Sequence, residues 1–210
     1  MDAHGIRTET RLGEALGNLQ ACLLDDARAN SGANLAQRIT SETQSLLSWA
    51  EQRGCCVDFD TWIQSTAALE IIGEGNEHRV WLQAGVQPIR VLKITQPPSY
   101  GVHGSAISYV ENLLRCNQGF GDDIRVEGVT LTDQGPAILT SQPFIQGDCA
   151  SETCIHLYFT ALGYEYQGHN LWQHPQTGVR IADARPANIL IDQSGECFPI
   201  DVHVLDAFPH

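Results

Sequence analysis

The amino-acid sequence predicts an α+β fold, and three observations lead to this class. Leucines recur at helical spacing in the first part of the chain, which predicts helices there. From residue 70 onward, short runs rich in β-branched residues alternate with turn signals, as is typical of antiparallel strands. Two amphipathic segments, 105–118 and 151–163, interrupt these runs with helical periodicity. With 210 residues and 42% hydrophobic content, the chain can bury a core.

Residues 1–69 are expected to form a helical N-terminal extension. Its helically spaced leucines are Leu12, Leu16, Leu19 and Leu23. Ser41 and Gln44 form a capping-box pattern that predicts a helix over 42–53, and Gly54 is expected to end it. Asp60 is a candidate cap for the short helix that follows. The segment holds no cluster of reactive groups, so we expect a scaffold role.

The strands of the second part are bounded by turn residues. Turn signals at Asp133-Gln134-Gly135 and Gln193-Ser194-Gly195 separate apolar runs, which predicts antiparallel hairpins. Ser151 is the expected cap of the later helix, and Gly163 is its expected end. The expected elements are strands within 70–83, strand 89–95, helix 105–118, strands 124–132 and 136–145, helix 151–163, hairpin 170–181, and strands 188–192 and 197–204.

Charge and cysteine content limit the classes of function. The formal net charge is −13, and such a surface repels phosphate backbones, so we expect no nucleic-acid partner. The seven cysteines are odd in number and form no CxxC pair, which favours a reduced, cytoplasmic chain. The sequence shows neither an apolar signal segment nor a run of membrane-spanning length. We therefore expect a soluble cytoplasmic protein without a membrane partner.

Three polar residues near the C-terminus stand beside apolar strands. Asp183 and Asn188 lie in 181-IADARPANILID-192, and Asp201 follows Ile200 after the next turn. Hard cations such as Mg²⁺ take oxygen ligands, typically carboxylates plus substrate phosphates. Asn188 and Asp201 could supply those oxygens while Asp183 accepts a proton. Each residue taken singly could also be a loop cap or a strand end; the three together favour a site.

Lys93 is the single lysine of the chain, because every other basic residue is one of 11 arginines. It lies in the apolar strand 89-IRVLKIT-95. A compact ammonium retained at one position suggests a place where a guanidinium does not fit, such as a phosphate contact. Glu111 on the next helix is its candidate partner. The alternative is a solvated lysine on an edge strand.

Gly73 and Gly75 open the run 73-GEGNEHRV-80. Glycines at these positions let backbone amides, including that of Asn76, approach a phosphate closely. The same pattern fits an ordinary tight hairpin turn. No GxxxxGK[ST] pattern is present, so the chain is not a P-loop NTPase.

Taken in order, these features resemble the protein-kinase signature set. Gly73 and Gly75 with Val80 resemble the glycine-rich loop, with His78 in place of the third glycine. Val91-Leu92-Lys93 resembles the lysine strand, and Glu111 falls where the ion-pair glutamate is expected. The segment 141-SQPFIQG-147 resembles the adenine-binding hinge. Residues 183-DARPAN-188 resemble the catalytic loop D-L-K-P-x-N, with Arg185 in place of the lysine, and Asp201 resembles the aspartate of DFG.

The chain is most similar to the serine/threonine/tyrosine kinase-like domain of polyvalent proteins of phages and conjugative elements. The strings FGDDIRVEGV, ILTSQPFIQG, DARPANIL and PIDV carry this resemblance, which spans about residues 45–204. It implies a minimal protein-kinase-like fold in a domain over 70–210. A small antiparallel N-lobe with one helix is expected at 70–141, a hinge at 142–147, and a reduced C-lobe at 148–210.

The resemblance also implies an ATP- and Mg²⁺-dependent phosphotransferase that acts on an unknown hydroxyl of a protein or small molecule. The implied catalytic residues are Lys93, Asp183 and Arg185, and the implied metal ligands are Asn188 and Asp201. The implied nucleotide-binding residues are Gly73, Gly75, Asn76, Lys93, Glu111, Gln142 and Phe144.

Departures from the kinase pattern leave other functions open. Ile181-Ala182 stand in place of His-Arg before the catalytic aspartate, and Val202-His203 stand in place of Phe-Gly after Asp201. Only nine residues follow Asp201, so we expect no activation loop. One alternative is a catalytically weak or inactive nucleotide-binding module of the pseudokinase type. Another is a small-molecule phosphotransferase similar to aminoglycoside kinases. A third is a zinc site, for which the candidate ligands are His169, His174 and Cys197.

Overall fold

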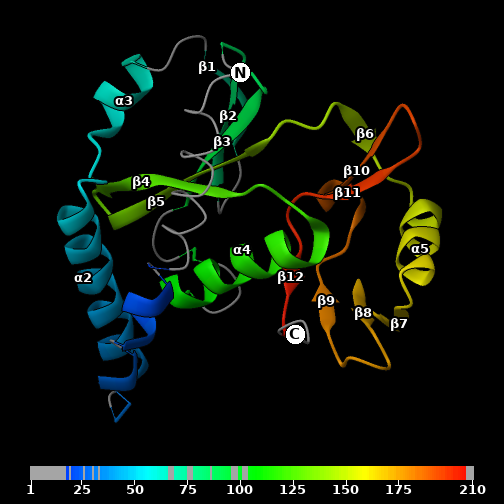
Figure 1. Cartoon of the computed structure of the whole chain (residues 1–210), viewed down its shortest axis with the longest axis horizontal. Coiled ribbons are helices and arrows are strands. Elements are labelled where there is room, and N and C mark those ends of the chain that lie inside the picture. Colours follow the sequence, from blue (N-terminus) through cyan, green and yellow to red (C-terminus); the bar gives the residue numbers. More distant parts are fainter. Residues whose placement is uncertain are drawn as a thin grey trace, which may run out of the picture. The chain divides into compact units, whose positions relative to one another are not determined.

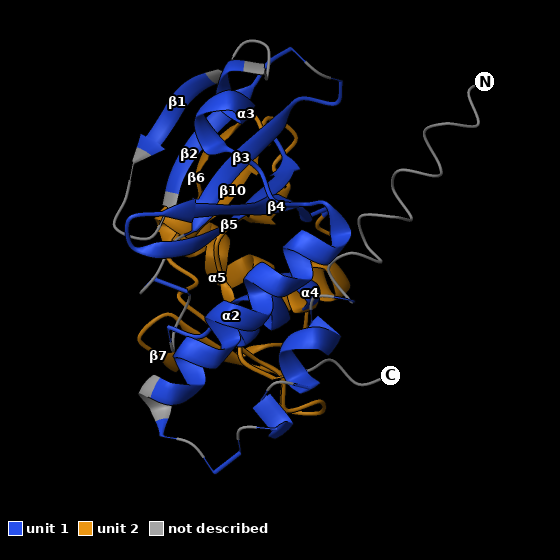
Figure 2. Cartoon of the chain, turned by 90° about the vertical axis from the view of Figure 1, so that its left-hand side faces the viewer, with its two compact units in different colours: residues 1–114, 123–144 blue, residues 115–122, 145–210 orange. Residues whose placement is uncertain are grey.

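The computed structural model describes residues 18, 20–25, 27–29, 31–32, 34–65, 69–74, 78–85, 87–95, 99–100 and 104–206. The chain forms two compact units (Figure 2). Unit 1 contains Met1–Leu114 and Asp123–Phe144, and unit 2 contains Arg115–Asp122 and Ile145–His210. Helices and antiparallel sheets are combined in the chain (Figure 1), so the predicted α+β class is confirmed.

Helix α2 (Leu35–Arg53) begins earlier than the sequence suggested. Asn34 is its N-cap, and Asn34 and Gln37 form the capping box with two hydrogen bonds of 3.0 Å. The predicted start at Ser41 was wrong, because this earlier box already satisfies the first free amides and no helix-breaking residue follows it. Gly54, with a φ of 65°, ends the helix as predicted.

Helix α3 (Phe59–Ser65) has Asp58 as its cap. The side chain of Asp58 accepts a hydrogen bond of 2.8 Å from the backbone amide of Thr61, whereas the predicted cap, Asp60, lies inside the first turn. Leu12, Leu16 and Leu19 lie outside the described residues, and Leu23 is buried. Among the helices that the structure describes, none has both the length and the apolar character needed to cross a membrane.

Unit 1 is built on a five-stranded antiparallel sheet. Its strands are β1 (Leu69–Glu74), β2 (His78–Gln83), β3 (Arg90–Thr95), β4 (Arg125–Thr132) and β5 (Gly135–Pro143). The spatial order is β1-β2-β3-β5-β4, so β3 is the central strand. Helix α4 (Ala106–Phe120) connects β3 to β4 and begins where the sequence predicted a helix.

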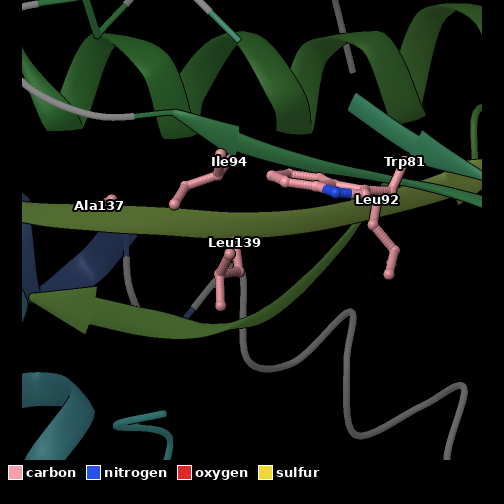
Figure 3. Close-up of a cluster of buried hydrophobic side chains, with 5 residues drawn as sticks. All are labelled: Trp81, Leu92, Ile94, Ala137 and Leu139. Carbon is pink, nitrogen blue, oxygen red and sulfur yellow. The ribbon is translucent and has the colours of Figure 1, made fainter. Parts of the chain in front are cut away.

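One face of this sheet carries an apolar cluster (Figure 3). Its buried members are Trp81, Leu92, Ile94, Ala137 and Leu139, and the partly buried residues packed on it include Phe59, Trp62 and Ile63 of α3. The rings of Phe59 and Trp81 meet edge to face at 5.4 Å. Helix α3 therefore covers this face. Because side chains alternate along a strand, Lys93, which lies between Leu92 and Ile94, belongs to the opposite face.

A short backbone bridge joins the end of α2 to the sheet. The amide of Val57 donates to the carbonyl of Val129 on β4, and the amide of Val129 donates to the carbonyl of Cys55, both at 2.9 Å. Gly128 lies at a bulge in β4. A Cβ atom there would lie 2.7 Å from the carbonyl oxygen of Cys55, so glycine permits this close approach.

Unit 2 contains two small antiparallel sheets and one helix. The first sheet has the order β11-β10-β6, with β6 at Gly147–Cys149, β10 at Ile189–Asp192 and β11 at Cys197–Pro199. The second has the order β12-β9-β8-β7, with β7 at Glu165–Gly168, β8 at Leu171–Gln173, β9 at Arg180–Ala182 and β12 at His203–Val204. The predicted strand 197–204 is interrupted at residues 200–202, and β7 was not predicted.

Helix α5 (Glu152–Ala161) covers an aromatic core in unit 2. Ser151 is its N-cap, as predicted, and accepts a hydrogen bond of 3.2 Å from the amide of Cys154. The ring of Phe159 stacks on that of Trp172 at 5.1 Å, and both side chains are fully buried. The ring of His156 meets the same indole edge to face at 4.8 Å. These contacts fasten α5 to β8.

The close approach at Gly128 predicts a strong effect of a single methyl group. We expect Gly128→Ala to lower the free energy of unfolding by about 1–3 kcal/mol, because the added Cβ has to displace the backbone of Cys55. Gly32→Ala is the matched control, since a Cβ at Gly32 meets no atom within 4 Å. Denaturant unfolding of both variants measures the difference. Equal stability of the two would contradict the steric role of Gly128.

Candidate active site

Lys93 lies on the central strand of the unit 1 sheet rather than on an edge. In the register of the sheet, Gly73 pairs with Val80, Val80 with Lys93, and Lys93 with Thr140. Directly paired residues of antiparallel strands point to the same face, so these four residues form one row. We call this side of the sheet the Lys93 face. Lys93 is half-buried there, which argues against the alternative of a solvated edge lysine.

Helix α4 packs on the Lys93 face. Thr95 lies two positions after Lys93 on β3, so its side chain points to the same side. Its hydroxyl donates to the hydroxyl of Tyr109 on α4 at 2.9 Å, and both residues are buried. Glu111 is half-buried two positions further along this helix. The structure thus brings the helix of the predicted partner to the face of Lys93, and the ion pair between the two residues stays a prediction.

Of the other predicted nucleotide-binding residues of unit 1, Gly73, Gln142 and Phe144 are described by the structure. Gly73 is next to a bulge of β1, whereas Gly75 and Asn76 lie outside the described residues. Gln142 pairs with Val91 near the end of β5 and is half-buried. The amide of the half-buried Phe144 donates to the carbonyl of Ile89 at 3.0 Å. This amide is therefore already bonded within the fold.

Asp183 and Asn188 are joined directly in unit 2. The amide nitrogen Nδ2 of Asn188 donates to the backbone carbonyl of Asp183 at 2.9 Å and to its carboxylate Oδ2 at 2.6 Å. Asp183 has a φ of 55°, a left-handed conformation that aspartate tolerates better than most residues. A short 3-10 helix, η2 (Pro186–Asn188), closes the loop. Asn188 is buried, so it fixes the carboxylate of Asp183 from inside the fold.

Arg185 forms an ion pair with Asp183. Its Nε lies 3.1 Å from Oδ1 of the carboxylate, and both side chains are partly exposed. An exposed pair of this kind contributes only about 0–1 kcal/mol to stability. The pair can therefore open at small cost when a more negative group, such as a phosphate, approaches Arg185.

Strand pairing brings Asp201 to the same loop. The amide of Ile200 donates to the carbonyl of Asn188 at 2.8 Å, one step beyond the register of β10 with β11. On the other side, His203 pairs with Ala182 in the register of β12 with β9. Between these two pairs lie residues 183–187 on one segment, which begins with Asp183, and residues 201–202 on the other, which begins with Asp201. Asn188 thus contacts Asp183 directly, and the exposed Asp201 directly follows the residue whose backbone is bonded to Asn188.

This group offers oxygen ligands to a hard cation. Nδ2 of Asn188 is bonded to Asp183, so a cation could bind only its Oδ1, and the carboxylate of Asp201 could supply a second oxygen. One or two protein oxygens completed by phosphate and water suit Mg²⁺. Among the residues that the structure describes, no three His, Cys, Asp or Glu side chains gather as a metal site. The zinc alternative with His169, His174 and Cys197 is therefore not supported.

A comparison with known protein families identifies the family of this chain. A family model described as a serine/threonine/tyrosine kinase found in polyvalent proteins matches residues 40–205. The chain belongs to this kinase family. The match contains every candidate residue from Gly73 to Asp201, and it supports kinase-like activity in general with a nucleotide as substrate. No curated protein matched the kinase chain.

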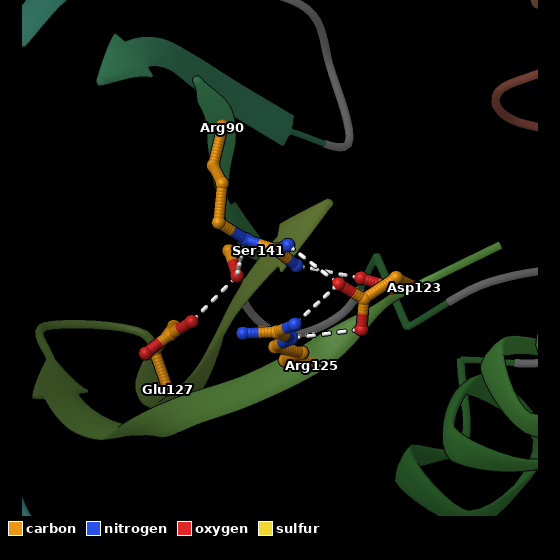
Figure 4. Close-up of polar contacts among 5 residues, drawn as sticks. All are labelled: Arg90, Asp123, Arg125, Glu127 and Ser141. Atoms are coloured by element: carbon orange, nitrogen blue, oxygen red, sulfur yellow. Dashed lines mark hydrogen bonds and ion pairs between the residues drawn. The ribbon is translucent and has the colours of Figure 1, made fainter. Parts of the chain in front are cut away.

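A charged network in unit 1 was not foreseen from the sequence of this kinase (Figure 4). Arg90 is only 6% exposed, and its Nε donates to the hydroxyl of Ser141 at 2.9 Å. Its other nitrogens donate to a carboxylate oxygen and the carbonyl of Asp123, at 2.7 and 2.6 Å. Ser141 donates in turn to Glu127, and Arg125 also pairs with Asp123. The network ties β3, β4 and β5 together where the predicted hinge begins.

The sequence contained only a weak signal for this network. Arg90 interrupts an otherwise apolar strand, and Asp123 and Arg125 are charges of opposite sign two positions apart, but their meeting depends on the register of three strands. Burial raises the pKa of the Asp123 carboxyl, but hydrogen bonds from Arg125 and Arg90, with the charges of both, bring it below its ordinary value. Asp123 therefore stays ionised and keeps the buried guanidinium of Arg90 neutralised.

The lowered pKa of Asp123 predicts how unfolding depends on pH. The unfolded chain takes up this proton first, so the contribution of Asp123 is present above the ordinary pKa of 3.8 and is lost as pH falls through the lowered native value. We expect Asp123→Asn to cost about 1 kcal/mol at pH 7, because its partly exposed carboxylate is screened, and to flatten the loss of stability in acid. Denaturant unfolding across acidic pH measures this. Asp133→Asn, in an exposed turn, is the control, and identical pH profiles of the two variants would contradict the prediction.

Proposed function

We propose that this kinase transfers the γ-phosphoryl group of Mg·ATP to a hydroxyl acceptor through a minimal protein-kinase-like fold. In this proposal, residues 70–141 form the N-lobe, 142–147 the hinge and 148–210 the reduced C-lobe, with residues 1–69 as a helical extension. The observation that carries the proposal is the hydrogen bond that fixes the carboxylate of Asp183 to Asn188, with Asp201 next to the residue paired with Asn188. Such an arrangement would combine a fixed carboxylate with two further oxygen ligands.

Asn188 and Asp201 would hold the metal ion. Bound Mg²⁺ would neutralise the triphosphate, which the net charge of −13 would otherwise repel. The hydrogen bonds from Nδ2 of Asn188 to Asp183 fix the side-chain amide of Asn188, so its Oδ1 would be a preorganised ligand. A preorganised ligand loses little conformational entropy on binding.

Asp183 would accept the proton of the acceptor hydroxyl. As the acceptor oxygen forms its bond to the γ-phosphorus, the bond from that phosphorus to the bridging oxygen of ADP breaks, and the hydroxyl proton passes to the carboxylate of Asp183. Asn188 holds that carboxylate at 2.6 Å, which keeps it in one orientation. Arg185 would leave its exposed pair with Asp183 and stabilise the transferring group. Positioning and electrostatics supply most of the catalysis in this chemistry.

The residues of unit 1 would bind the nucleotide. Lys93, supported by Glu111, would contact the α- and β-phosphates from the central strand. Backbone amides from Gly73 through Gly75 to Asn76 would cover the phosphates, as the glycines allow. The adenine would bind backbone groups of the hinge at Gln142 and Phe144, where Phe144 would accept through its carbonyl because its amide is bonded to Ile89.

Nucleotide binding tests the proposed ligands. We expect wild-type protein to bind Mg·ATP in isothermal titration, and Lys93→Met and Asp201→Ala each to weaken the affinity at least about tenfold, through loss of a charge-assisted phosphate contact and of a metal ligand respectively. Asp148→Ala removes another exposed carboxylate of unit 2 and serves as the control. No binding by wild type, or equal binding by Asp201→Ala, would show that the proposed site is wrong.

Turnover tests the role of Asp183 separately from binding. We expect Asp183→Asn to reduce the rate of ADP formation by about 10²–10⁴-fold while the affinity for Mg·ATP stays within about twofold, because the amide keeps an oxygen for Asn188 but is not a base. Comparison of protein acceptors with a small-molecule panel distinguishes the two acceptor classes. If wild type binds Mg·ATP and forms no ADP with any acceptor or with water, the protein is a nucleotide-binding module instead.

A further inference from the structure

Glu42 on α2 is the one carboxylate that is buried among the residues that the structure describes. Its side chain is 3% exposed, and its Oε2 accepts a hydrogen bond of 2.8 Å from the hydroxyl of Ser105, which is 8% exposed. A buried carboxylate costs several kcal/mol in lost hydration unless other groups compensate for it. Glu42 therefore needs groups that compensate for its lost hydration, and the hydroxyl of Ser105 is one of them.

Ser105 is the residue that precedes α4. Its carbonyl accepts from the amide of Tyr109 at 3.1 Å, and its hydroxyl accepts from the amide of Ser108 at 3.4 Å. These are the bonds of a residue that caps the first turn. The hydroxyl proton is then directed to Glu42, so the carboxylate lies beside the positive end of the dipole of α4. Glu42 thus extends the cap of α4 with a group from another helix.

The position of α4 matters because of what the helix carries. Glu111 lies six positions after Ser105 on the same helix. Two of the contacts that hold this part of α4 are the bond from Ser105 to Glu42 at its start and the bond between Thr95 and Tyr109 on the Lys93 face, beside the packing of buried side chains such as Val110. A helix held at its first turn cannot slide or rotate without breaking that bond. The bond to Glu42 therefore contributes to the position of the helix that carries Glu111.

We propose that Glu42 is a positioning residue for the kinase site: it holds the N-terminus of α4 and thereby sets Glu111 for its partner Lys93. This inference rests on the proposed function, because it assigns to α2 a part in nucleotide binding by Lys93. It also gives the N-terminal helical segment a role beyond that of a scaffold. Glu42 touches neither nucleotide nor acceptor and acts through Ser105 and α4.

The test is a double-mutant cycle in Mg·ATP affinity. Glu42→Leu removes the acceptor but keeps a buried side chain of similar volume, and we expect it to weaken the affinity about tenfold. In a Glu111→Gln background, where the proposed partner of Lys93 is lost, the same change is expected to have less than about a twofold effect. Glu42→Gln keeps an oxygen for Ser105 and is expected to restore affinity to within about threefold of wild type. Glu51→Leu, at an exposed position of α2, is the matched control.

A purely structural Glu42 would give a different result. In that case Glu42→Leu would lower the free energy of unfolding without changing the Kd for Mg·ATP of the folded protein. Alternatively, its effect on this Kd would be the same with and without the Glu111→Gln substitution. If Glu42→Leu does not fold, Ser105→Ala breaks the same hydrogen bond and enters the same cycle. Hydrogen exchange at the amides of Tyr109 and Val110 gives a readout without nucleotide, and we expect faster exchange in each variant.

The outcomes separate this inference from the proposed function. Wild-type protein that binds no Mg·ATP overturns the proposed function, and the role of Glu42 with it. Wild-type binding together with an unchanged Kd in folded Glu42→Leu, or with additive effects of the two substitutions, overturns the role of Glu42 alone. Loss of affinity that disappears in the Glu111→Gln background supports it.

Discussion

The backbone pairing around Asn188 is the constraint on which the candidate site depends. The amide of Ile200 is bonded to the carbonyl of Asn188, and the pairing of His203 with Ala182 closes the same loop from the other side. These pairings hold the two ends of the segment that begins with Asp183, and they limit how far Asp201 can lie from Asn188. The two strands of β12 and β9 are short, yet they fix this arrangement because buried backbone groups cannot be left without partners. Backbone pairing thus sets where these polar residues lie in the fold, and side-chain hydrogen bonds fix the orientation of Asp183.

A second constraint is the position of the only lysine of the chain on a central strand. A cation on the central strand of a sheet loses part of its hydration and needs polar groups nearby to compensate. In unit 1 the apolar cluster occupies the α3 side of the sheet. The Lys93 face is mixed: it carries the apolar Val80 and Ile138, and also Thr140 and the buried hydrogen bond between Thr95 and Tyr109. The polar side chains next to Lys93 therefore lie on the face opposite to the cluster.

Sequence reasoning located local features better than the contacts that depend on register. Gly54, Ser151 and the hairpin at 170–181 were predicted correctly because each depends on a few adjacent residues. The start of α2 and the cap of α3 were wrong by a few positions, since Asn34 and Asp58 compete with equally good caps nearby. The spacing of Asp183 and Asn188 revealed a polar loop, but Arg90 with Asp123 and Glu42 with Ser105 join residues 33 and 63 positions apart. No local pattern encodes such pairs.

The aromatic core of unit 2 has a spectroscopic consequence. The sequence has four tryptophans, of which Trp49, Trp62 and Trp81 belong to unit 1 and Trp172 alone to unit 2. Trp172 is stacked on Phe159 and shielded from solvent, so its emission reports directly on whether α5 is docked. Replacing the other three indoles with phenylalanine would leave one intrinsic fluorophore in the half of the molecule that carries Asp183. The unfolding of unit 2 could then be followed by intrinsic tryptophan fluorescence, without an attached dye.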